Sequence, residues 1–68
     1  MSVFPERLQA ARKKQGLSSQ AMAELLNVTQ RAYLYYEQGK REPPYDRLVD
    51  LARELNVSTD YLLGLSDQ

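Results

Sequence analysis

Apolar residues near the start of the chain recur at the spacing of one helical face. Phe4, Leu8 and Ala11 occupy positions i, i+4 and i+7, and residues so spaced line up along one side of an α-helix. A proline, which suits a first helical turn, follows Phe4, and Gly16 is typical of a helix end. The pattern predicts a helix over residues 5–15.

A second apolar group follows Ser18, whose hydroxyl suits the N-cap of a helix. Met22, Leu25 and Leu26 would supply the buried side of this short helix. We expect it to end near Asn27, because asparagine tolerates the left-handed backbone of a tight turn between helices. The connection to the next helix is therefore expected to be very short.

The middle of the chain predicts a third helix that starts at an N-cap residue, Thr29. Tyr33 and Tyr36 lie three residues apart and so share one face of this helix. Gly39 ends the run, and the two prolines at positions 43 and 44 then force an extended connection.

Helical spacing resumes in the last third of the chain. The apolar positions there are Leu48, Leu51, Ala52 and Leu55. They predict a fourth helix over residues 45–56, and Ser58 would cap a last short helix that runs to residue 63. Because no segment alternates between apolar and polar positions as a strand does, the predicted fold class is all-α.

Length and composition exclude several classes of function. Sixty-eight residues suffice for one domain with a single small core. The absence of cysteine and histidine removes disulfides, thiolate nucleophiles, most transition-metal sites and the commonest general base. We therefore expect a protein that is not an enzyme and that uses no cofactor. Neither a leader peptide nor an apolar run approaching about 18 residues is present, which predicts a cytoplasmic protein with no membrane partner.

The charges are balanced over the whole chain but unevenly distributed along it. Nine basic and nine acidic side chains cancel. Residues 1–41, however, carry seven basic and three acidic side chains, whereas residues 42–68 carry two and six. A domain with such a dipole can present its positive part to a phosphate backbone while its acidic part faces away.

The order and spacing of several short motifs resemble a known family. From about Phe4 to Gly64 the chain is similar to the phage repressor and Cro type of helix-turn-helix domain, as found in XRE-like regulators. The resemblance lies in Arg12…Gly16-Leu17-Ser18, Ala23-Glu24-Leu25-Leu26-Asn27-Val28-Thr29, Tyr36-Glu37-Gln38-Gly39-Lys40-Arg41-Glu42-Pro43, Leu55-Asn56-Val57-Ser58 and Asp60-Tyr61-Leu62-Leu63-Gly64. It implies a compact five-helix, lambda-repressor-like fold. It also implies one DNA-binding domain over residues 1–68, with the helix-turn-helix motif at about residues 18–38.

The resemblance assigns structural roles as well. Ala23 is the small residue at which the two helices of the motif cross, and Asn27 stands where the family usually has glycine. Arg12 and Glu37 match a pair that forms a largely buried ion pair in the family. The implied buried positions are Met22, Leu26, Val28, Tyr33 and Tyr36. Tyr33 is larger than the aliphatic residue usual at its position, so local repacking is expected.

Four outward residues of the third helix would meet DNA bases. By family position they are Gln30, Arg31, Leu34 and Tyr35. A helix laid in the major groove touches base edges with its first residues; Gln30 suits adenine and Arg31 suits guanine, each through two hydrogen bonds. Leu34 and Tyr35 depart from the family pattern, which is commonly polar or basic there. They predict an exposed apolar patch beside the polar start of the helix.

Phosphate contacts are implied on both flanks of that helix. At the start of the second helix, unpaired backbone N–H groups point outward from Ser18, Ser19 and Gln20. The serine at position 19 is shorter than the glutamine that the family often has there. Lys40 and Arg41, just beyond the third helix, would straddle the backbone on the other flank.

These residues favour a sequence-specific DNA-binding regulator of transcription, of the repressor kind. It would bind double-stranded operator DNA as a homodimer and would need no small-molecule ligand. Family analogy places the dimer surface in the C-terminal half, where Tyr45, Val57 and Leu65 are candidates. The alternative is a protein-interaction module that keeps the fold and uses the Leu34 and Tyr35 face. DNA binding would weaken steeply as salt rises, whereas apolar docking would not.

Overall fold

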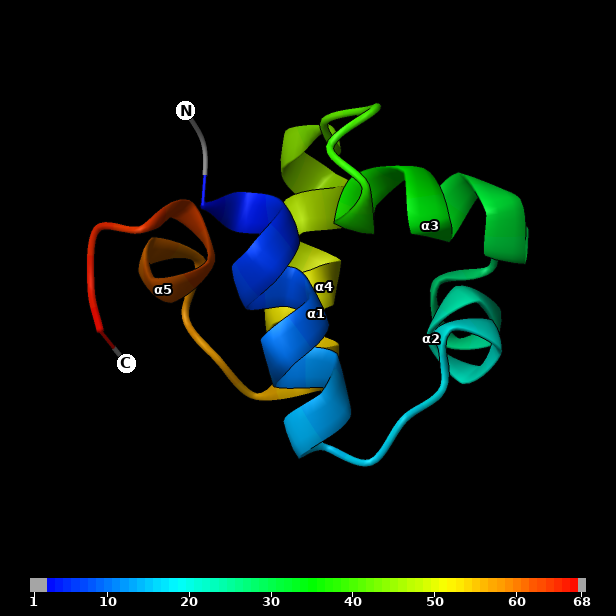
Figure 1. Cartoon of the computed structure of the whole chain (residues 1–68), viewed down its shortest axis with the longest axis horizontal. Coiled ribbons are helices and arrows are strands. Elements are labelled where there is room, and N and C mark those ends of the chain that lie inside the picture. The colour runs from blue at the N-terminus through cyan, green and yellow to red at the C-terminus, as the bar shows by residue number, and fades with distance from the viewer. Residues whose placement is uncertain (1–2, 68) are drawn as a thin grey trace.

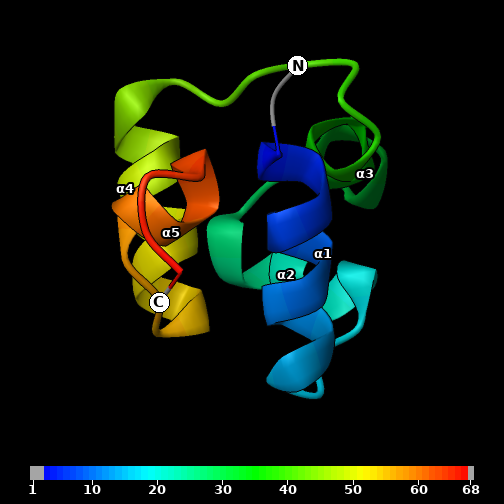
Figure 2. The same cartoon turned by 60° about the vertical axis from the view of Figure 1, so that its left-hand side comes forward.

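Five helices account for the regular structure of residues 3–67, which are the residues that the computed structural model describes. They are α1 (Phe4–Lys14), α2 (Ser19–Leu26), α3 (Gln30–Glu37), α4 (Tyr45–Leu55) and α5 (Thr59–Leu63). In Figure 1, α1 and α4 lie in the middle of the molecule, with α5 on one side and α2 and α3 on the other. Figure 2 shows the long connection from α3 to α4 passing over the top of the molecule. No strand is present among these residues, as expected.

Most helix ends lie where short-range signals in the sequence place them. Ser18, Thr29 and Ser58 are N-caps, and each side chain accepts a hydrogen bond from the backbone N–H three residues further on. Asn27 and Asn56 are C-caps in the left-handed conformation, with φ of 59° and 57°. The three predicted N-caps and the turn at Asn27 are thus confirmed. Asn56 follows the last residue of α4 instead of belonging to the helix.

Two predictions about helix bounds and faces need correction. α1 begins at Phe4 and ends at Lys14, one residue earlier at both ends than predicted. Leu25 was expected on the buried side of α2 but is 52% exposed, whereas Ala23 is 1% exposed. Each residue of an α-helix turns the chain by about 100°, so Leu25 lies almost opposite Ala23. The buried side of α2 extends from Met22 through Leu26 to Ala23, and Leu25 lies beyond its edge.

The core draws on all five helices. Its buried residues are Phe4, Leu8, Ala11, Met22, Ala23, Leu26, Tyr33, Tyr36, Leu51, Ala52, Leu55 and Leu62. Val28 and Leu48 are only half-buried and pack against this core. Tyr33 is 0% exposed, and its ring meets that of Tyr36 edge-on, with centroids 6.5 Å apart and planes at 88°. This edge-on packing accommodates the large side chain.

Long polar side chains tie the ends of three helices to the rest of the fold. The hydrogen bonds run from Arg47 Nη1 to the Leu26 carbonyl (2.6 Å), from Gln15 Nε2 to the Leu55 carbonyl (3.2 Å) and from Arg7 Nη1 to the Tyr61 carbonyl (2.9 Å). The last carbonyls of a helix have no partner within it, and cations are favoured there by the helix dipole. These contacts hold α2 against α4, the C-cap residue of α1 against the end of α4, and α1 against α5. Within residues 3–67, no helix has both the length and the apolar character needed to cross a membrane.

Candidate nucleic-acid interface

The connection between α2 and α3 is short and well defined. It consists of residues 27–29, and Asn27 there has the left-handed backbone. The Val28 N–H donates to the carbonyl of Ala23 at 3.0 Å, which closes the end of α2. Because Ala23 is small and buried, α2 and α3 pack closely next to this turn.

One side of α3 is anchored in the core and its N-terminal end is accessible. Tyr33 and Tyr36 supply the buried side, whereas Gln30 and Arg31 are exposed. Figure 1 shows this end of α3 at the edge of the molecule, next to α2 and away from α5. The first polar side chains of α3 can therefore meet a partner outside the chain.

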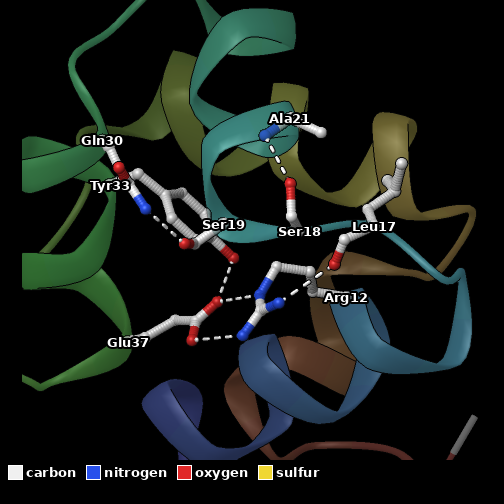
Figure 3. Close-up of polar contacts among 8 residues, drawn as sticks. All are labelled: Arg12, Leu17, Ser18, Ser19, Ala21, Gln30, Tyr33 and Glu37. Atoms are coloured by element: carbon white, nitrogen blue, oxygen red, sulfur yellow. Dashed lines mark hydrogen bonds and ion pairs between the residues drawn. The ribbon is translucent and has the colours of Figure 1, made fainter.

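A hydrogen bond joins the starts of α2 and α3. Gln30 Nε2 donates to Ser19 Oγ at 2.9 Å (Figure 3). The side-chain oxygen of Gln30 stays available as an acceptor, and its second amide hydrogen as a donor. A serine at position 19 is therefore long enough to reach the first residue of α3.

A second group of contacts centres on Tyr35. Arg31 Nε donates to the Tyr35 hydroxyl at 3.0 Å, and the guanidinium carbon of Arg31 lies 5.9 Å from the centroid of the Tyr35 ring. The ammonium nitrogen of Lys40 lies 5.8 Å from the same centroid. The backbone N–H groups of Lys40 and Arg41 both donate to the Tyr35 carbonyl, at 2.9 and 3.4 Å. The loop after α3 is thus fixed to the residue that also holds Arg31.

The prediction of an exposed apolar patch on α3 is wrong. Leu34 is half-buried and packs against the core. Tyr35 is also half-buried, with two cations next to its ring. Both side chains are therefore already engaged by the fold, because the helix turns them toward the core and toward the loop that follows.

A buried ion pair fixes the far end of α3 to α1. Arg12 Nε donates to Glu37 Oε2 at 2.6 Å and Arg12 Nη2 donates to Glu37 Oε1 at 3.1 Å. The two side chains are 12% and 3% exposed. Arg12 Nη1 also donates to the Leu17 carbonyl at 3.0 Å, and the Tyr33 hydroxyl donates to Glu37 (Figure 3). No buried side-chain nitrogen or oxygen in residues 3–67 lacks a hydrogen-bond partner.

The protonation states of this cluster follow from its geometry. The hydrogen bond to Glu37 raises the pKa of the Arg12 guanidinium. Burial, followed by the hydrogen bond to Glu37, raises the pKa of the Tyr33 hydroxyl well above its ordinary value near 10. Arg12 is charged and Tyr33 is neutral at neutral pH. Glu37 therefore accepts hydrogen bonds from one cationic donor and from one neutral hydroxyl.

The predicted phosphate contacts occupy two places. Ser18, Ser19 and Gln20 lie at the start of α2; Ser18 and Gln20 are exposed and Ser19 is half-buried. The Ser18 hydroxyl caps α2, and the Ser19 hydroxyl accepts from Gln30. Lys40 and Arg41 are exposed in the loop that follows α3.

A family model for the helix-turn-helix matches residues 8–62, which include α2, α3 and their connection. The chain belongs to the helix-turn-helix family. It is of the XRE-like type to which phage repressors belong, as the motifs had indicated.

Curated relatives of this helix-turn-helix protein come from Bacillus subtilis. The uncharacterized HTH-type transcriptional regulator YqaE is 46% identical over 61 residues, which cover 90% of this chain and 53% of the relative. The HTH-type transcriptional regulator ImmR is 44% identical over 59 residues, which cover 87% and 46%. The chain spans about half the length of the curated relatives that it matches.

Solved structures of the same fold cover almost the whole chain. The P22 c2 repressor protein, in complex with a synthetic operator, superposes with a TM-score of 0.87 at 30% identity, over 97% of this chain and 100% of that one. A transcriptional regulator from Listeria innocua superposes with a TM-score of 0.86 at 35% identity, over 100% and 64%. These similarities confirm the predicted all-α, five-helix fold of the phage-repressor type.

Sequence reasoning missed three kinds of contact in this region. The bonds from Gln30 to Ser19 and from Tyr33 to Glu37 were not expected, nor was the placement of Arg31 and Lys40 around Tyr35. The i, i+4 spacing of two of these pairs on α3 was an available signal. The contacts of Ser19 and Lys40 span a turn or a loop, and no such spacing rule covers them.

Proposed function

We propose that this protein is a sequence-specific DNA-binding regulator of transcription that inserts α3 into the major groove and performs no enzymatic step. The observation that carries the proposal is the placement of Gln30 and Arg31, exposed at the N-terminal end of a helix whose other side is buried in the core. A recognition helix contacts base edges with its N-terminal residues in this way. The relatives and the P22 c2 repressor, described above, support the same conclusion.

The proposed base readers are the first two residues of α3. Gln30 would pair with adenine, accepting from N6 and donating to N7, and Arg31 would donate two hydrogen bonds to guanine. Each such pair discriminates against a wrong base by about 1–3 kcal/mol. Base contacts by Leu34 and Tyr35, one turn further along α3, stay predictions; the methyl groups of Leu34 would pack on a thymine methyl.

The proposed phosphate contacts flank this helix. Backbone N–H groups at Ser18, Ser19 and Gln20 would bind one phosphate at the start of α2. Lys40 and Arg41 would bind the backbone beyond the end of α3. Phosphate contacts position a protein on the duplex without reading its sequence, so these five residues would set affinity and register, not specificity.

We further propose that residues 1–68 act as one DNA-binding domain, with the motif at about residues 18–38, in a cytoplasmic repressor that binds a two-fold operator as a homodimer. Two copies of α3 would then face successive major grooves about 34 Å apart. Tyr45 and Leu65, 91% and 76% exposed, are available to such a dimer interface, whereas Val57 packs against the core.

Selection of bound sites from random duplexes tests the proposal directly. We expect one enriched motif with two half-sites, and a steep loss of affinity as salt rises. Arg31→Ala should lower affinity for the enriched site more than for random DNA. Arg53→Ala is a matched control, because Arg53 lies on α4 and its side chain is 73% exposed; it should change neither affinity.

Two outcomes would contradict this assignment. Equal losses on the enriched site and on random DNA would reduce Arg31 to a phosphate contact. Selection that enriches no sequence would refute specific DNA recognition altogether. The alternative, a protein-interaction module built on Leu34 and Tyr35, is not favoured, because the core and the two cations already engage these side chains.

A further inference from the structure

We infer that Tyr35 is a positioning residue that orients the guanidinium of Arg31 for guanine, and so determines specificity without itself needing to touch a base. The inference rests on the proposed function and assigns a recognition role within the same site. It predicts a guanine at the base pair that Arg31 reads, and a preference for that guanine that depends on the Tyr35 hydroxyl.

The first observation is the edge of the guanidinium that Tyr35 occupies. Arg31 Nε donates to the Tyr35 hydroxyl at 3.0 Å. A guanidinium has five N–H bonds in one plane, and the Nε–H is on its side edge. The Nε–H is therefore engaged by Tyr35. The end of the guanidinium stays free, and there one N–H on each Nη forms a pair of parallel donors. These two donors match guanine O6 and N7.

The second observation is that the backbone keeps this arrangement in place. Arg31 and Tyr35 are both on α3, four residues apart, and side chains with that spacing lie next to one another on a helix. The guanidinium carbon is 5.9 Å from the Tyr35 ring centroid, where a cation is attracted to the ring face. The ring restricts the position of the group, and the hydroxyl restricts its rotation.

The third observation is that Tyr35 itself has contacts beyond α3. Its backbone carbonyl accepts from the N–H groups of Lys40 and Arg41, at 2.9 and 3.4 Å, and the Lys40 ammonium lies 5.8 Å from its ring centroid. Tyr35 is therefore held by the loop after α3 as well as by the helix. The backbone bonds fix the position of the residue, and the contacts with Arg31 and Lys40 restrict its side chain. Less freedom is then lost when DNA arrives, which favours binding by a preorganised arginine.

The chemistry of the bases makes guanine the expected partner. An arginine offers donors alone, and guanine presents two acceptors, N7 and O6, on its major-groove edge. Adenine presents N7 as an acceptor but a donor at N6, so an end-on guanidinium would leave one of its donors facing another donor. An arginine that rotates freely could turn to a phosphate instead, and would discriminate less.

The test compares Tyr35→Phe with the wild-type protein. The substitution keeps the ring and removes the hydroxyl. Arg31→Ala first identifies the base pair at which discrimination between bases is lost. Affinities are then measured for the selected site and for the three variants of that site that carry another base pair at this position. Because one hydrogen bond is removed, we expect the guanine preference to fall by about 2–10-fold at that base pair. Affinity for random DNA should stay unchanged, and Tyr35→Phe should have no further effect in the Arg31→Ala background.

A measurement on the free protein tests the contact without DNA. In nitrogen-15 NMR spectra, the Arg31 Nε–H should exchange slowly with water in the wild type and rapidly in Tyr35→Phe. The Arg12 Nε–H, which donates to Glu37, serves as the matched control and should not change. An unchanged thermal unfolding curve would show that the variant folds normally.

The outcomes separate the inference from the proposed function. A wild-type protein that selects no sequence would refute both. If the wild type selects a site, the inference alone fails under any of three results: an unchanged guanine preference in Tyr35→Phe, a loss at a different base pair, or an equal loss on all DNA. The second would make Tyr35 a base contact, and the third would make it a phosphate contact.

Discussion

At the scale of single residues, the most consequential feature is a carboxylate enclosed by the fold. The side chain of Glu37 is 3% exposed and receives hydrogen bonds from Arg12 and Tyr33. A buried charge is tolerated only when it is paired and hydrogen-bonded. Such a pair contributes little net stability over an apolar replacement, but it is costly to break. Its role in this protein is to fix the end of α3 against α1.

Removal of one partner of the Arg12–Glu37 ion pair should therefore be strongly destabilising. We expect Arg12→Leu to lower the free energy of unfolding by about 3–5 kcal/mol, because Glu37 would stay buried without a cation. Urea denaturation monitored by circular dichroism measures this change. The control is Arg53→Ala, which removes an exposed pair with Asp50 at 3.8 Å and should cost less than about 0.5 kcal/mol. Similar costs for the two variants would mean that the burial of Glu37 has no energetic consequence.

The raised pKa of Tyr33 predicts how stability depends on pH. In the folded state the hydroxyl keeps its proton above pH 10, whereas in the unfolded state it loses it near pH 10. The folded state then binds more protons than the unfolded state, so stability is complete below about pH 10 and falls as pH rises further. Each pH unit costs up to about 1.4 kcal/mol from this group.

Urea denaturation at several pH values between 9 and 11 measures that slope. Tyr33→Phe should start from a lower stability, because Glu37 loses a donor, and should show a shallower decline above pH 10. A decline of equal steepness in the two proteins would assign the alkaline loss to other groups.

At the scale of elements, the start of α3 depends on one local hydrogen bond. The Thr29 hydroxyl accepts from the backbone N–H of Ala32 at 3.1 Å and so caps the helix immediately before Gln30 and Arg31. Removal of an N-cap side chain destabilises a helix at its first turn. That turn carries the proposed base readers, so the cap connects local stability to recognition.

We expect Thr29→Ala to lower the free energy of unfolding by about 1 kcal/mol. We also expect it to weaken binding to the selected site by more than the small rise in the unfolded fraction would cause. Thermal unfolding and binding to the selected site measure the two effects. Thr59→Ala is the matched control, since Thr59 lies within α5 and is not its N-cap; it should change stability by less than about 0.5 kcal/mol. If the Thr29→Ala variant binds as tightly as the wild type, the first turn forms on DNA without its cap.

At the scale of the whole molecule, balanced charge conceals a polarity that suits a DNA partner. The basic excess of residues 1–41 includes Arg31, Lys40 and Arg41 of the proposed interface, and the acidic excess lies in the part of the chain that forms α4 and α5. Net charge alone would have argued against nucleic acid. The distribution reverses that argument, because only the side that meets the phosphates needs to be positive.

Lys40 tests this electrostatic contribution. Lys40→Ala should weaken binding to the selected site and to random DNA by the same factor, and should reduce the slope of log affinity against log salt by about one. Fluorescence anisotropy over a range of salt concentrations measures both quantities, with Arg53→Ala again as the control. A loss confined to the selected site would instead mean that Lys40 reads a base, or that it acts mainly through its contact with Tyr35.

The amino-acid sequence by itself determined the helices, three of their N-caps and the turn at Asn27, because each depends on residues within about four positions of one another. It also indicated the family, and with it the outward residues Gln30 and Arg31. Their contacts with DNA remain predictions.

The tertiary structure decided what depends on residues far apart in the chain. It exposed Leu25 and brought Arg47 to the end of α2. It added the Tyr33 hydroxyl to the buried pair of Arg12 and Glu37, which the resemblance had implied. It also gathered Arg31 and Lys40 around Tyr35. Periodicity states which residues share a side of a helix, but only the packing of the helices settles which side is covered and which distant donor reaches a given acceptor.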